Sequence, residues 1–247
     1  MSDKLVIIPT YNEKENIERI IRYVMDMKNS YHILVVDDNS PDGTANIVKN
    51  LIEEYPDRLF IEERTGKLGL GTAYIHGFKW ALNRDYNYIF EMDADFSHNP
   101  DDLDRLYQAV ADGADLAIGS RYVTGVNVVN WPMSRVLMSY YASKYVKFVT
   151  GLKINDATAG FICYARHTLE AFNFDNIKFT GYGFQIEMKY ITSKLGGIIK
   201  EVPIVFVDRT EGKSKMNTNI FGEAFFGVIN LRFRNYKKLH NEIIREK

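Results

Sequence analysis

The stretch that decides the fold is Tyr88-Ile89-Phe90-Glu91-Met92-Asp93-Ala94-Asp95, an apolar run that leads directly into two carboxylates. Such a run predicts a buried β-strand, because a strand covered on both faces needs no apolar–polar alternation. Similar runs occupy residues 5–8 and 33–36, and each is followed by apolar residues at helical spacing. Strands that alternate with helices indicate an α/β fold on a mainly parallel sheet.

The remaining pattern extends this alternation along the chain. We expect further strands at residues 59–61, 115–119, 160–165 and 201–207, and helices at 12–27, 44–55, 71–83, 134–150 and 181–195. In sheets of this type, ligands bind outside the carboxyl ends of the strands. The sequence therefore predicts one crevice formed by residues 9–13, Asp37, Asp38 and residues 93–95.

Composition and charge exclude several classes of protein. The 31 Lys and Arg residues balance 32 Asp and Glu residues, so the chain has no overall basic field for nucleic acid. A hydrophobic share of 46% is ordinary for a globular protein and excludes a disordered chain. The single cysteine, Cys163, allows no internal disulfide and suits a reducing compartment. No apolar run reaches the 18 or so residues of a membrane span, so we expect a soluble or peripheral membrane protein.

The acidic strand ends predict a metal–nucleotide site. Asp93 and Asp95 are hard oxygen ligands of the kind that Mg²⁺ or Mn²⁺ shares with phosphate groups and water. Taken alone, the two residues could equally form a solvated turn, because Asp is common after strands. Asp38 and Glu13 favour the metal site, since carboxylates gathered in one crevice repel each other unless a cation balances them.

Three motifs carry a resemblance to a known family: residues 6–13 (VIIPTYNE), 35–44 (VVDDNSPDGT) and 92–100 (MDADFSHNP). The chain resembles the inverting family-2 glycosyltransferases of GT-A fold, from residue 5 to about residue 217. Within them it is most similar to the dolichyl-phosphate or polyprenyl-phosphate mannose synthases, through residues 119–122, 134–135, 181–188 and 208–216. The resemblance implies a Rossmann-like, mixed but mostly parallel sheet with helices on both faces.

The resemblance also implies a reaction and residue roles. The expected reaction moves mannose from GDP-mannose to a polyprenyl phosphate, with Mg²⁺ or Mn²⁺ as cofactor. Catalytic roles fall to Asp95, Arg121 and Arg135, and metal ligation falls to Asp93, Asp95 and Ser97. Many members carry Gln where Ser97 stands. Donor binding is expected from Pro9, Tyr11, Glu13, Val36, Asp38, Asp93, Ala94, Arg209 and Lys215.

The acceptor class decides whether a general base is needed. Arg121 and Arg135 suit a phosphate acceptor, because guanidinium groups donate planar, paired hydrogen bonds to phosphate. A polyprenyl phosphate is already anionic, so it can attack the sugar unaided, whereas a sugar hydroxyl needs a carboxylate base. We therefore assign no base, although Asp156, Gln185 and Glu187 are candidates.

The C-terminal segment predicts an amphipathic helix from Phe221 to Ile244. Apolar residues recur every three or four positions there, and the charged residues are mainly basic. We divide the chain into a catalytic domain at residues 1–219 and this helix at 220–247, which either packs on the same core or docks on a membrane. The expected location is the cytoplasmic face of a membrane, reached through peripheral contact or a membrane partner subunit.

Two alternatives remain open at this point. One keeps the lipid phosphate acceptor but uses another donor, such as UDP-glucose or a UDP-amino sugar. The other is a nucleotidyltransferase, which would normally show a glycine-rich basic loop after the first strand; residues 9–13 are not of that kind.

Overall fold

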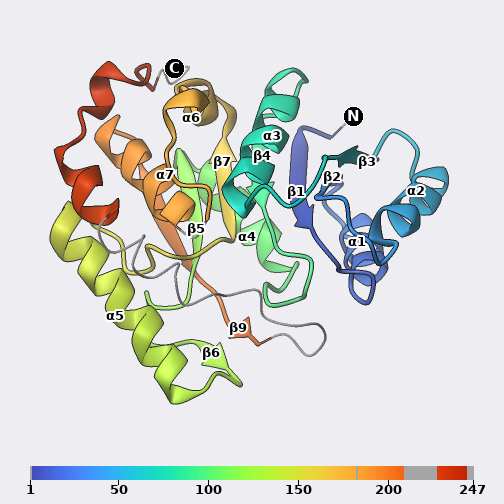
Figure 1. Cartoon of the computed structure of the whole chain (residues 1–247), viewed down its shortest axis with the longest axis horizontal. Helices are drawn as coiled ribbons and strands as arrows, with labels where there is room; N and C mark the ends of the chain where they lie inside the picture. The colour runs from blue at the N-terminus through green and yellow to red at the C-terminus, as the bar shows by residue number, and fades with distance from the viewer. Residues whose placement is uncertain (1, 182, 209–226, 244–247) are drawn as a thin grey trace.

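The computed structural model describes residues 2–181, 183–208 and 227–243. Its main sheet has seven strands in the order β3-β2-β1-β4-β7-β5-β8 (Figure 1). Their bounds are β1 (Lys4–Thr10), β2 (His32–Asp37), β3 (Leu59–Glu63), β4 (Tyr88–Glu91), β5 (Leu116–Ser120), β7 (Ile162–Ala165) and β8 (Ile199–Pro203). In this sheet β7 runs antiparallel to β4 and β5, and the other neighbours run parallel. The expected mixed, mostly parallel sheet is confirmed.

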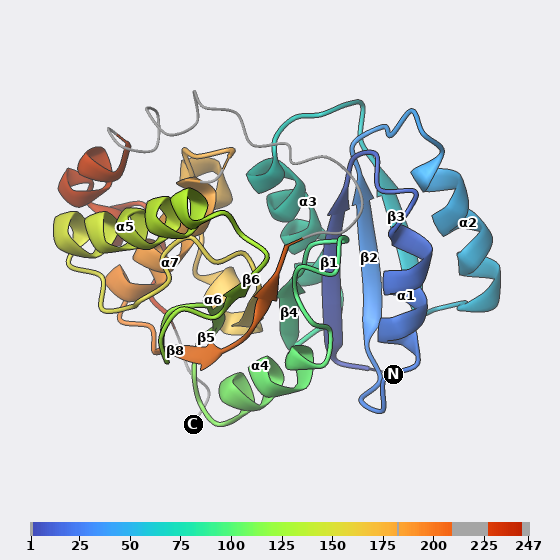
Figure 2. The same cartoon turned by 90° about the horizontal axis from the view of Figure 1, so that it is seen from below.

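Helices cover both faces of the sheet (Figure 2). Their bounds are α1 (Ile17–Met25), α2 (Thr44–Glu54), α3 (Leu70–Leu82), α4 (Asp102–Ala111), α5 (Met133–Thr150), α6 (Arg166–Glu170) and α7 (Gly183–Lys194). One hydrophobic cluster joins the sheet to α1, α2 and α4, and the other joins it to α3, α6 and α7. Gly77 lets α3 approach β1 closely, because a Cβ there would lie 2.7 Å from the Ile7 side chain.

The first helix begins later than the sequence pattern predicts. We expected it from residue 12, but α1 begins at Ile17. Asn12 has a φ of 57°, which lies in the left-handed region and is incompatible with a right-handed helix. The chain between β1 and α1 is therefore a loop.

The strand expected at residues 201–207 is divided between two sheets. β8 ends at Pro203, and β9 (Phe206–Val207) pairs instead with β6 (Val128–Val129) in a two-stranded ribbon. This division lets the chain leave the main sheet and cross beneath it, toward the carboxyl ends of the strands (Figure 1).

The prediction of one continuous C-terminal amphipathic helix is wrong for the described residues. Residues 227–233 are helical, and a 3-10 turn, η2 (Tyr236–Lys238), follows. The expected apolar face is not a single face, because Phe233 is 82% exposed while Tyr236 is buried in the core. The buried carboxylate of Glu187 bonds both Arg234 and Tyr236, and these contacts hold the segment against α7. Residues 221–226, 244–247 and the proposed domain boundary lie outside the described residues.

Candidate active site

Three hydrogen bonds join the loops that follow β1 and β2. Each runs from a main-chain N–H of the first loop to a side-chain oxygen of the second: Asn12 to Ser40, Glu13 to Thr44 and Lys14 to Asp42, at 3.0, 3.0 and 3.2 Å. The predicted convergence of these strand ends is therefore present. Glu13 itself is buried.

The two neighbouring aspartates at the end of β2 have different surroundings. The Asp37 carboxylate accepts hydrogen bonds from the hydroxyls of Thr10 and Ser40, at 2.7 and 2.6 Å, so it fixes the local turn. The Asp38 carboxylate instead accepts a hydrogen bond from Nε of Arg64, 2.6 Å away. The role of Asp38 in binding the nucleoside stays a prediction.

Because it pairs with the predicted nucleoside-binding residue Asp38, Arg64 is a candidate site residue, one that the sequence analysis did not name. It follows β3, its side chain is only 7% exposed, and its Nη1 also donates to the Thr72 hydroxyl at 2.8 Å. One signal in the sequence could have found it. Arg64 is a basic residue directly after the expected strand at 59–61, and the neighbouring strand ends in the acidic residues Asp37 and Asp38.

The other residues predicted to bind the nucleoside lie on or after β1 and β2, the strands beside β3. Pro9 and Val36 are register partners on β1 and β2. Val36 points its side chain into the core, so only its main chain is available to a ligand. The half-buried Tyr11 carries the Lys67 amine over its ring, 5.0 Å from the ring centre. Arg209 and Lys215 lie outside the described residues.

The acidic loop after β4 is compact. Asp95 accepts a hydrogen bond from the main-chain N–H of Ser97 at 3.0 Å, and both residues are buried. The His98 ring stacks on Phe161, with 4.8 Å between ring centres, and anchors the end of the loop. Burial lowers the pKa of His98 to about 4, so this ring is neutral at pH 7.

The chemistry of this loop fits a divalent cation of the Mg²⁺ type. Asp93, Asp95 and Ser97 offer carboxylate and hydroxyl oxygens within five residues, and Ala94 between them is buried. Within the described ranges, no three His, Cys, Asp or Glu side chains gather into a complete metal cage. An incomplete oxygen set suits a cation that also binds phosphate oxygens and water.

The two arginines predicted to meet the acceptor face one aromatic ring. The guanidinium carbons of Arg121 and Arg135 lie 5.5 and 4.1 Å from the ring centre of Trp131. Arg121 follows β5 and Arg135 lies on the first turn of α5, so the structure brings together residues from two different elements.

Each arginine also bonds a carboxylate. Nε and Nη2 of Arg121 donate to the two oxygens of Asp156, at 2.7 and 2.6 Å, and Nη1 of Arg135 donates to Asp208 at 2.9 Å. Burial alone would raise the pKa of Asp156, but the charge and hydrogen bonds of Arg121 outweigh it and hold that pKa below its usual value.

The β9 segment connects the arginines with the acidic loop. Phe206 lies 5.6 Å from the Arg121 guanidinium and packs edge-on against His98. The N–H of Val207 bonds the carbonyl of Ser97 at 3.3 Å. The structure therefore brings the predicted metal residues and the predicted acceptor residues next to each other through β9.

Comparison with known proteins identifies the family. The model of the family described as "Glycosyl transferase family 2" matches residues 5–172, more than half of the chain. The chain belongs to glycosyltransferase family 2.

Two relatives and one solved structure illustrate the similarity. This glycosyltransferase is 48% identical over 224 residues to the polyprenol monophosphomannose synthase of Mycolicibacterium smegmatis, covering 91% of this chain and 84% of that protein. It is 47% identical to the undecaprenyl-phosphate mannosyltransferase of Micrococcus luteus, covering 91% of each chain. A mannosyltransferase from Pyrobaculum calidifontis, solved with GDP-Man and Mn²⁺, has a TM-score of 0.59 at 20% identity, covering 94% of this chain and 63% of that one.

The candidates for a general base in this glycosyltransferase are all engaged in internal contacts. Asp156 holds Arg121, and Glu187 accepts hydrogen bonds from the main-chain N–H groups of Lys178 and Phe179. The Gln185 amide donates to the buried Glu91 carboxylate. The assignment of no general base stays a prediction.

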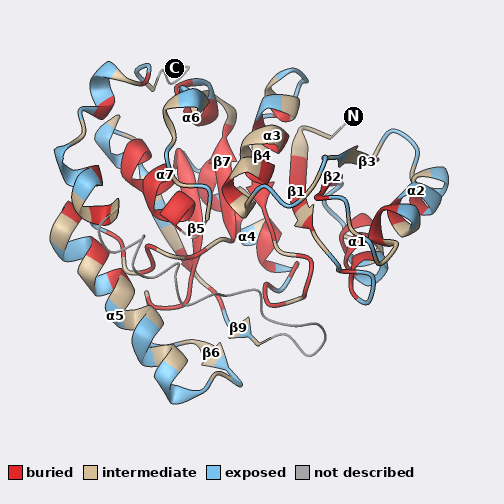
Figure 3. Ribbon diagram, viewed as in Figure 1, coloured by how far each residue is buried: buried red, intermediate tan, exposed pale blue. Residues whose placement is uncertain are grey.

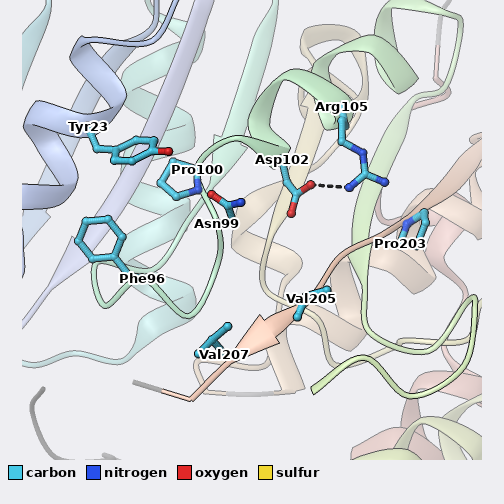
Figure 4. Close-up of a pocket in the computed structure, with 9 residues that line it drawn as sticks. All are labelled: Tyr23, Phe96, Asn99, Pro100, Asp102, Arg105, Pro203, Val205 and Val207. Atoms are coloured by element: carbon cyan, nitrogen blue, oxygen red, sulfur yellow. Dashed lines mark hydrogen bonds and ion pairs between the residues drawn. The ribbon is translucent and has the colours of Figure 1, made fainter. Parts of the chain in front are cut away.

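A cavity of about 490 Å³ lies behind the acidic loop of the glycosyltransferase (Figure 4). Phe96 lines it together with Tyr23, Val205 and Val207, and the ion pair of Asp102 and Arg105 forms its polar side. None of the predicted site residues lines this cavity. It is therefore distinct from the edge of the sheet at which Asp38 and Arg64 lie.

Proposed function

We propose that this glycosyltransferase moves a mannosyl group from GDP-mannose to a polyprenyl phosphate, producing polyprenyl-phosphate mannose and GDP. The observation that carries the proposal is the pair of arginines, Arg121 and Arg135, facing Trp131 beside the acidic loop. Two guanidinium groups suit a phosphate acceptor. The names of both curated relatives describe transfer of mannose to a polyprenyl lipid, which supports the same acceptor and sugar.

The proposed chemistry is a direct displacement at the anomeric carbon. An oxygen of the acceptor phosphate attacks from the face opposite the diphosphate and forms the new C–O bond. The bond between the anomeric carbon and the diphosphate oxygen breaks, and its electron pair leaves with GDP, so the anomeric centre is inverted. Alignment of two anionic groups supplies most of the rate enhancement, because the nucleophile is already ionised.

The two ends of the donor are assigned to different elements. Asp38, oriented by Arg64, would read the base, and Pro9, Tyr11, Glu13 and the main chain of Val36 would hold the nucleoside. Asp93 and Ala94 would lie beside the ribose and diphosphate. Asp93, Asp95 and Ser97 would hold Mg²⁺ or Mn²⁺, which neutralises charge on the departing diphosphate when bound. Arg209 and Lys215 remain predicted contacts of that diphosphate.

Mn²⁺ is the metal to test first. It accompanies GDP-Man in the Pyrobaculum calidifontis mannosyltransferase, whose similarity to this chain extends to the fold. The hard oxygen donors of Asp93, Asp95 and Ser97 accept either cation.

We place the membrane contact on α5, in place of the C-terminal helix expected from the sequence. Apolar side chains project from most turns of α5 into solvent, and Figure 3 shows little of this helix buried. The exposed set is Met133, Leu137, Met138, Tyr141 and Phe148. Phe148 is 89% exposed and Tyr141 is 64% exposed. A helix that faces only water rarely exposes large apolar side chains in such a group.

The charge of α5 suits an anionic lipid surface. The helix contains no Asp or Glu, and it exposes Lys144 and Lys147 beside the apolar side chains. Arg135 stands on its first turn, so a lipid held by α5 would carry its phosphate to the acceptor site. Within the described ranges, no helix is long and apolar enough to span a membrane.

This contact lets the chain reach the membrane by itself, so the proposal invokes no partner subunit. The cytoplasmic face is part of the proposal, and the buried free thiol of Cys163 agrees with a reducing compartment.

A transfer assay with defined donors and acceptors tests the proposal. The full chain is incubated with Mn²⁺, a short polyprenyl phosphate and either GDP-mannose, UDP-glucose or a UDP-amino sugar. We expect polyprenyl-phosphate mannose from GDP-mannose only. Product from a UDP-sugar would overturn the assignment of GDP-mannose as donor. Transfer to a sugar hydroxyl instead of the lipid would overturn the assignment of the acceptor. Membership of glycosyltransferase family 2 already decides against a nucleotidyltransferase.

A further inference from the structure

The two acceptor arginines bond carboxylates of contrasting exposure. The Arg121–Asp156 pair is buried, with side-chain exposures of 9% and 0%, and the guanidinium donates two hydrogen bonds to the carboxylate. The Arg135–Asp208 pair is 23% and 26% exposed, with one hydrogen bond of 2.9 Å. A phosphate that approaches this site therefore meets Arg121 in a buried ion pair and Arg135 in a partly exposed, weaker one.

Only the second pair can be exchanged at moderate cost. Separating Asp156 from Arg121 would leave a carboxylate unpaired in the protein interior, which is strongly unfavourable. Asp208 is accessible to water, so its carboxylate can be solvated once Arg135 turns to another anion. The exposure difference thus assigns Asp156 to orientation of Arg121, and makes Asp208 replaceable.

We propose that Asp208 is a specificity-determining residue, whose carboxylate occupies the Arg135 guanidinium until an acceptor phosphate displaces it. This inference rests on the proposed function, because it takes Arg121 and Arg135 as the acceptor phosphate site. No covalent step is involved. One ion pair is exchanged for another.

The exchange requires movement of a side chain and not of the strand. The N–H of Asp208 bonds the carbonyl of Val129 at 3.0 Å, and β9 pairs with β6 through main-chain groups alone. These bonds do not involve the Asp208 carboxylate, so the ribbon can persist after Arg135 is released.

A tethered carboxylate discriminates between free and lipid-linked phosphate. It acts as an intramolecular competitor with a high effective concentration, which a dissolved phosphate ion must exceed. A phosphate on a lipid held at α5 is itself concentrated beside Arg135, so it meets this competition on more equal terms. Asp208 weakens the binding of both ligands by the same factor and so raises the phosphate concentration that the site requires. A lipid phosphate concentrated at α5 reaches that concentration, and a dilute phosphate anion does not.

The test compares Asp208→Asn with wild type and with Asp175→Asn as a matched control. Asn keeps the size of the side chain and removes its charge. Asp175 forms an exposed pair with Lys79, away from the proposed site. For Asp208→Asn we expect the KM for polyprenyl phosphate to fall about fivefold, the effect that loss of an exposed ion pair produces at most, with kcat unchanged. Inhibition by inorganic phosphate should strengthen by about the same factor.

A second measurement does not depend on transfer. Inorganic phosphate is titrated into the full chain by calorimetry, with GDP and Mn²⁺ present to fill the donor site. Tighter phosphate binding by Asp208→Asn than by wild type and Asp175→Asn supports the proposal, even if no variant transfers mannose and the proposed function fails. Unchanged phosphate affinity, or a raised acceptor KM in an active variant, overturns it, because Asp208 would then be inert or would orient Arg135.

Discussion

Nε of Arg64 lies 2.6 Å from Oδ1 of Asp38, in an ion pair whose two side chains are less than 10% exposed. The pair fixes the carboxylate through one of its oxygens. A carboxylate held in this way is suited to accept N–H donors from a nucleobase, because it pays little ordering entropy when the ligand binds.

Replacement of Arg64 should weaken donor binding selectively. For Arg64→Ala we expect the KM for GDP-mannose to rise about tenfold, since a charge-assisted contact of this kind contributes roughly 1.5–3 kcal/mol. The KM for the lipid acceptor should stay the same. Initial rates at varied donor and acceptor concentrations measure both constants. A rise confined to the acceptor KM would remove Arg64 from the donor site.

Replacement of Asp95 should abolish transfer without unfolding the protein. Asp95→Ala removes an anionic oxygen from the loop that would hold the metal, together with the hydrogen bond that Asp95 accepts from the main-chain N–H of Ser97. We expect turnover below about one hundredth of wild type with saturating Mn²⁺, a loss typical for removal of a group that stabilises a leaving group. Circular dichroism and donor calorimetry separate loss of metal-dependent binding from unfolding. Substantial turnover in a folded variant would contradict the metal role.

The Arg121–Asp156 pair should be the more costly of the two arginine pairs to break. Asp156→Asn leaves a buried guanidinium without its counter-charge, and removal of one partner from such a pair costs about 3–5 kcal/mol. Urea unfolding measures this loss of stability. Glu170→Gln is the matched control, because it breaks an exposed pair with Arg166 and should cost less than about 1 kcal/mol. Similar losses in both variants would show that Asp156 does not hold a buried charge.

The strands of the fold were predictable because they are short, apolar and buried. Residues 5–8, 33–36 and 88–92 fall within or beside β1, β2 and β4, and their acidic ends identified the site edge. The antiparallel direction of β7 was not predictable from periodicity, since an apolar run reads the same for either direction. The expected mixed sheet came from the resemblance alone.

The contacts within the site were less predictable than its members. Asp156 was a base candidate in the sequence, but its partnership with Arg121 depends on two segments 35 residues apart. The C-terminal helix shows the same limit. The periodicity predicted one helix, but the described helix ends at Phe233, and Arg234 and Tyr236 beyond it bond the buried Glu187 carboxylate. Tertiary contacts of this kind override local helix propensity.

The exposed face of α5 predicts reversible, salt-sensitive binding to anionic vesicles. A double variant, Tyr141→Ser with Phe148→Ser, should reduce partition at least tenfold, because each apolar side chain that enters the interface contributes roughly 1–2 kcal/mol. Co-sedimentation at low and high salt measures this. Ile198→Ser is the control. Ile198 is also exposed, but it lies before the start of β8, whereas Arg121 lies beyond the end of the parallel strand β5. Equal loss in the control, or none in the double variant, would remove α5 from the membrane contact.

The buried amine of Lys189 predicts a pH dependence of stability. It donates to the carbonyls of Ala159 and Gln185, at 2.6 and 3.1 Å, and so fixes the segment that carries Asp156. Burial lowers the pKa of Lys189 from 10.5 to about 8. Between these values the unfolded chain binds more protons than the folded chain, so the free energy of unfolding rises with pH. Below pH 8 the folded protein bears the full cost of the buried charge.

Lys189→Met should remove this dependence. From pH 7 to 10.5 the free energy of unfolding of wild type should rise relative to that of Lys189→Met by on the order of 3 kcal/mol. The reason is that each unit of pKa shift corresponds to about 1.4 kcal/mol. Urea unfolding at closely spaced pH values measures the difference, in which the titrations of groups that do not interact with Lys189 cancel. Lys194→Met, an exposed lysine on the same helix, is the control and should give a constant difference. Parallel curves for wild type and Lys189→Met would show that the amine titrates at its ordinary pKa in the folded protein.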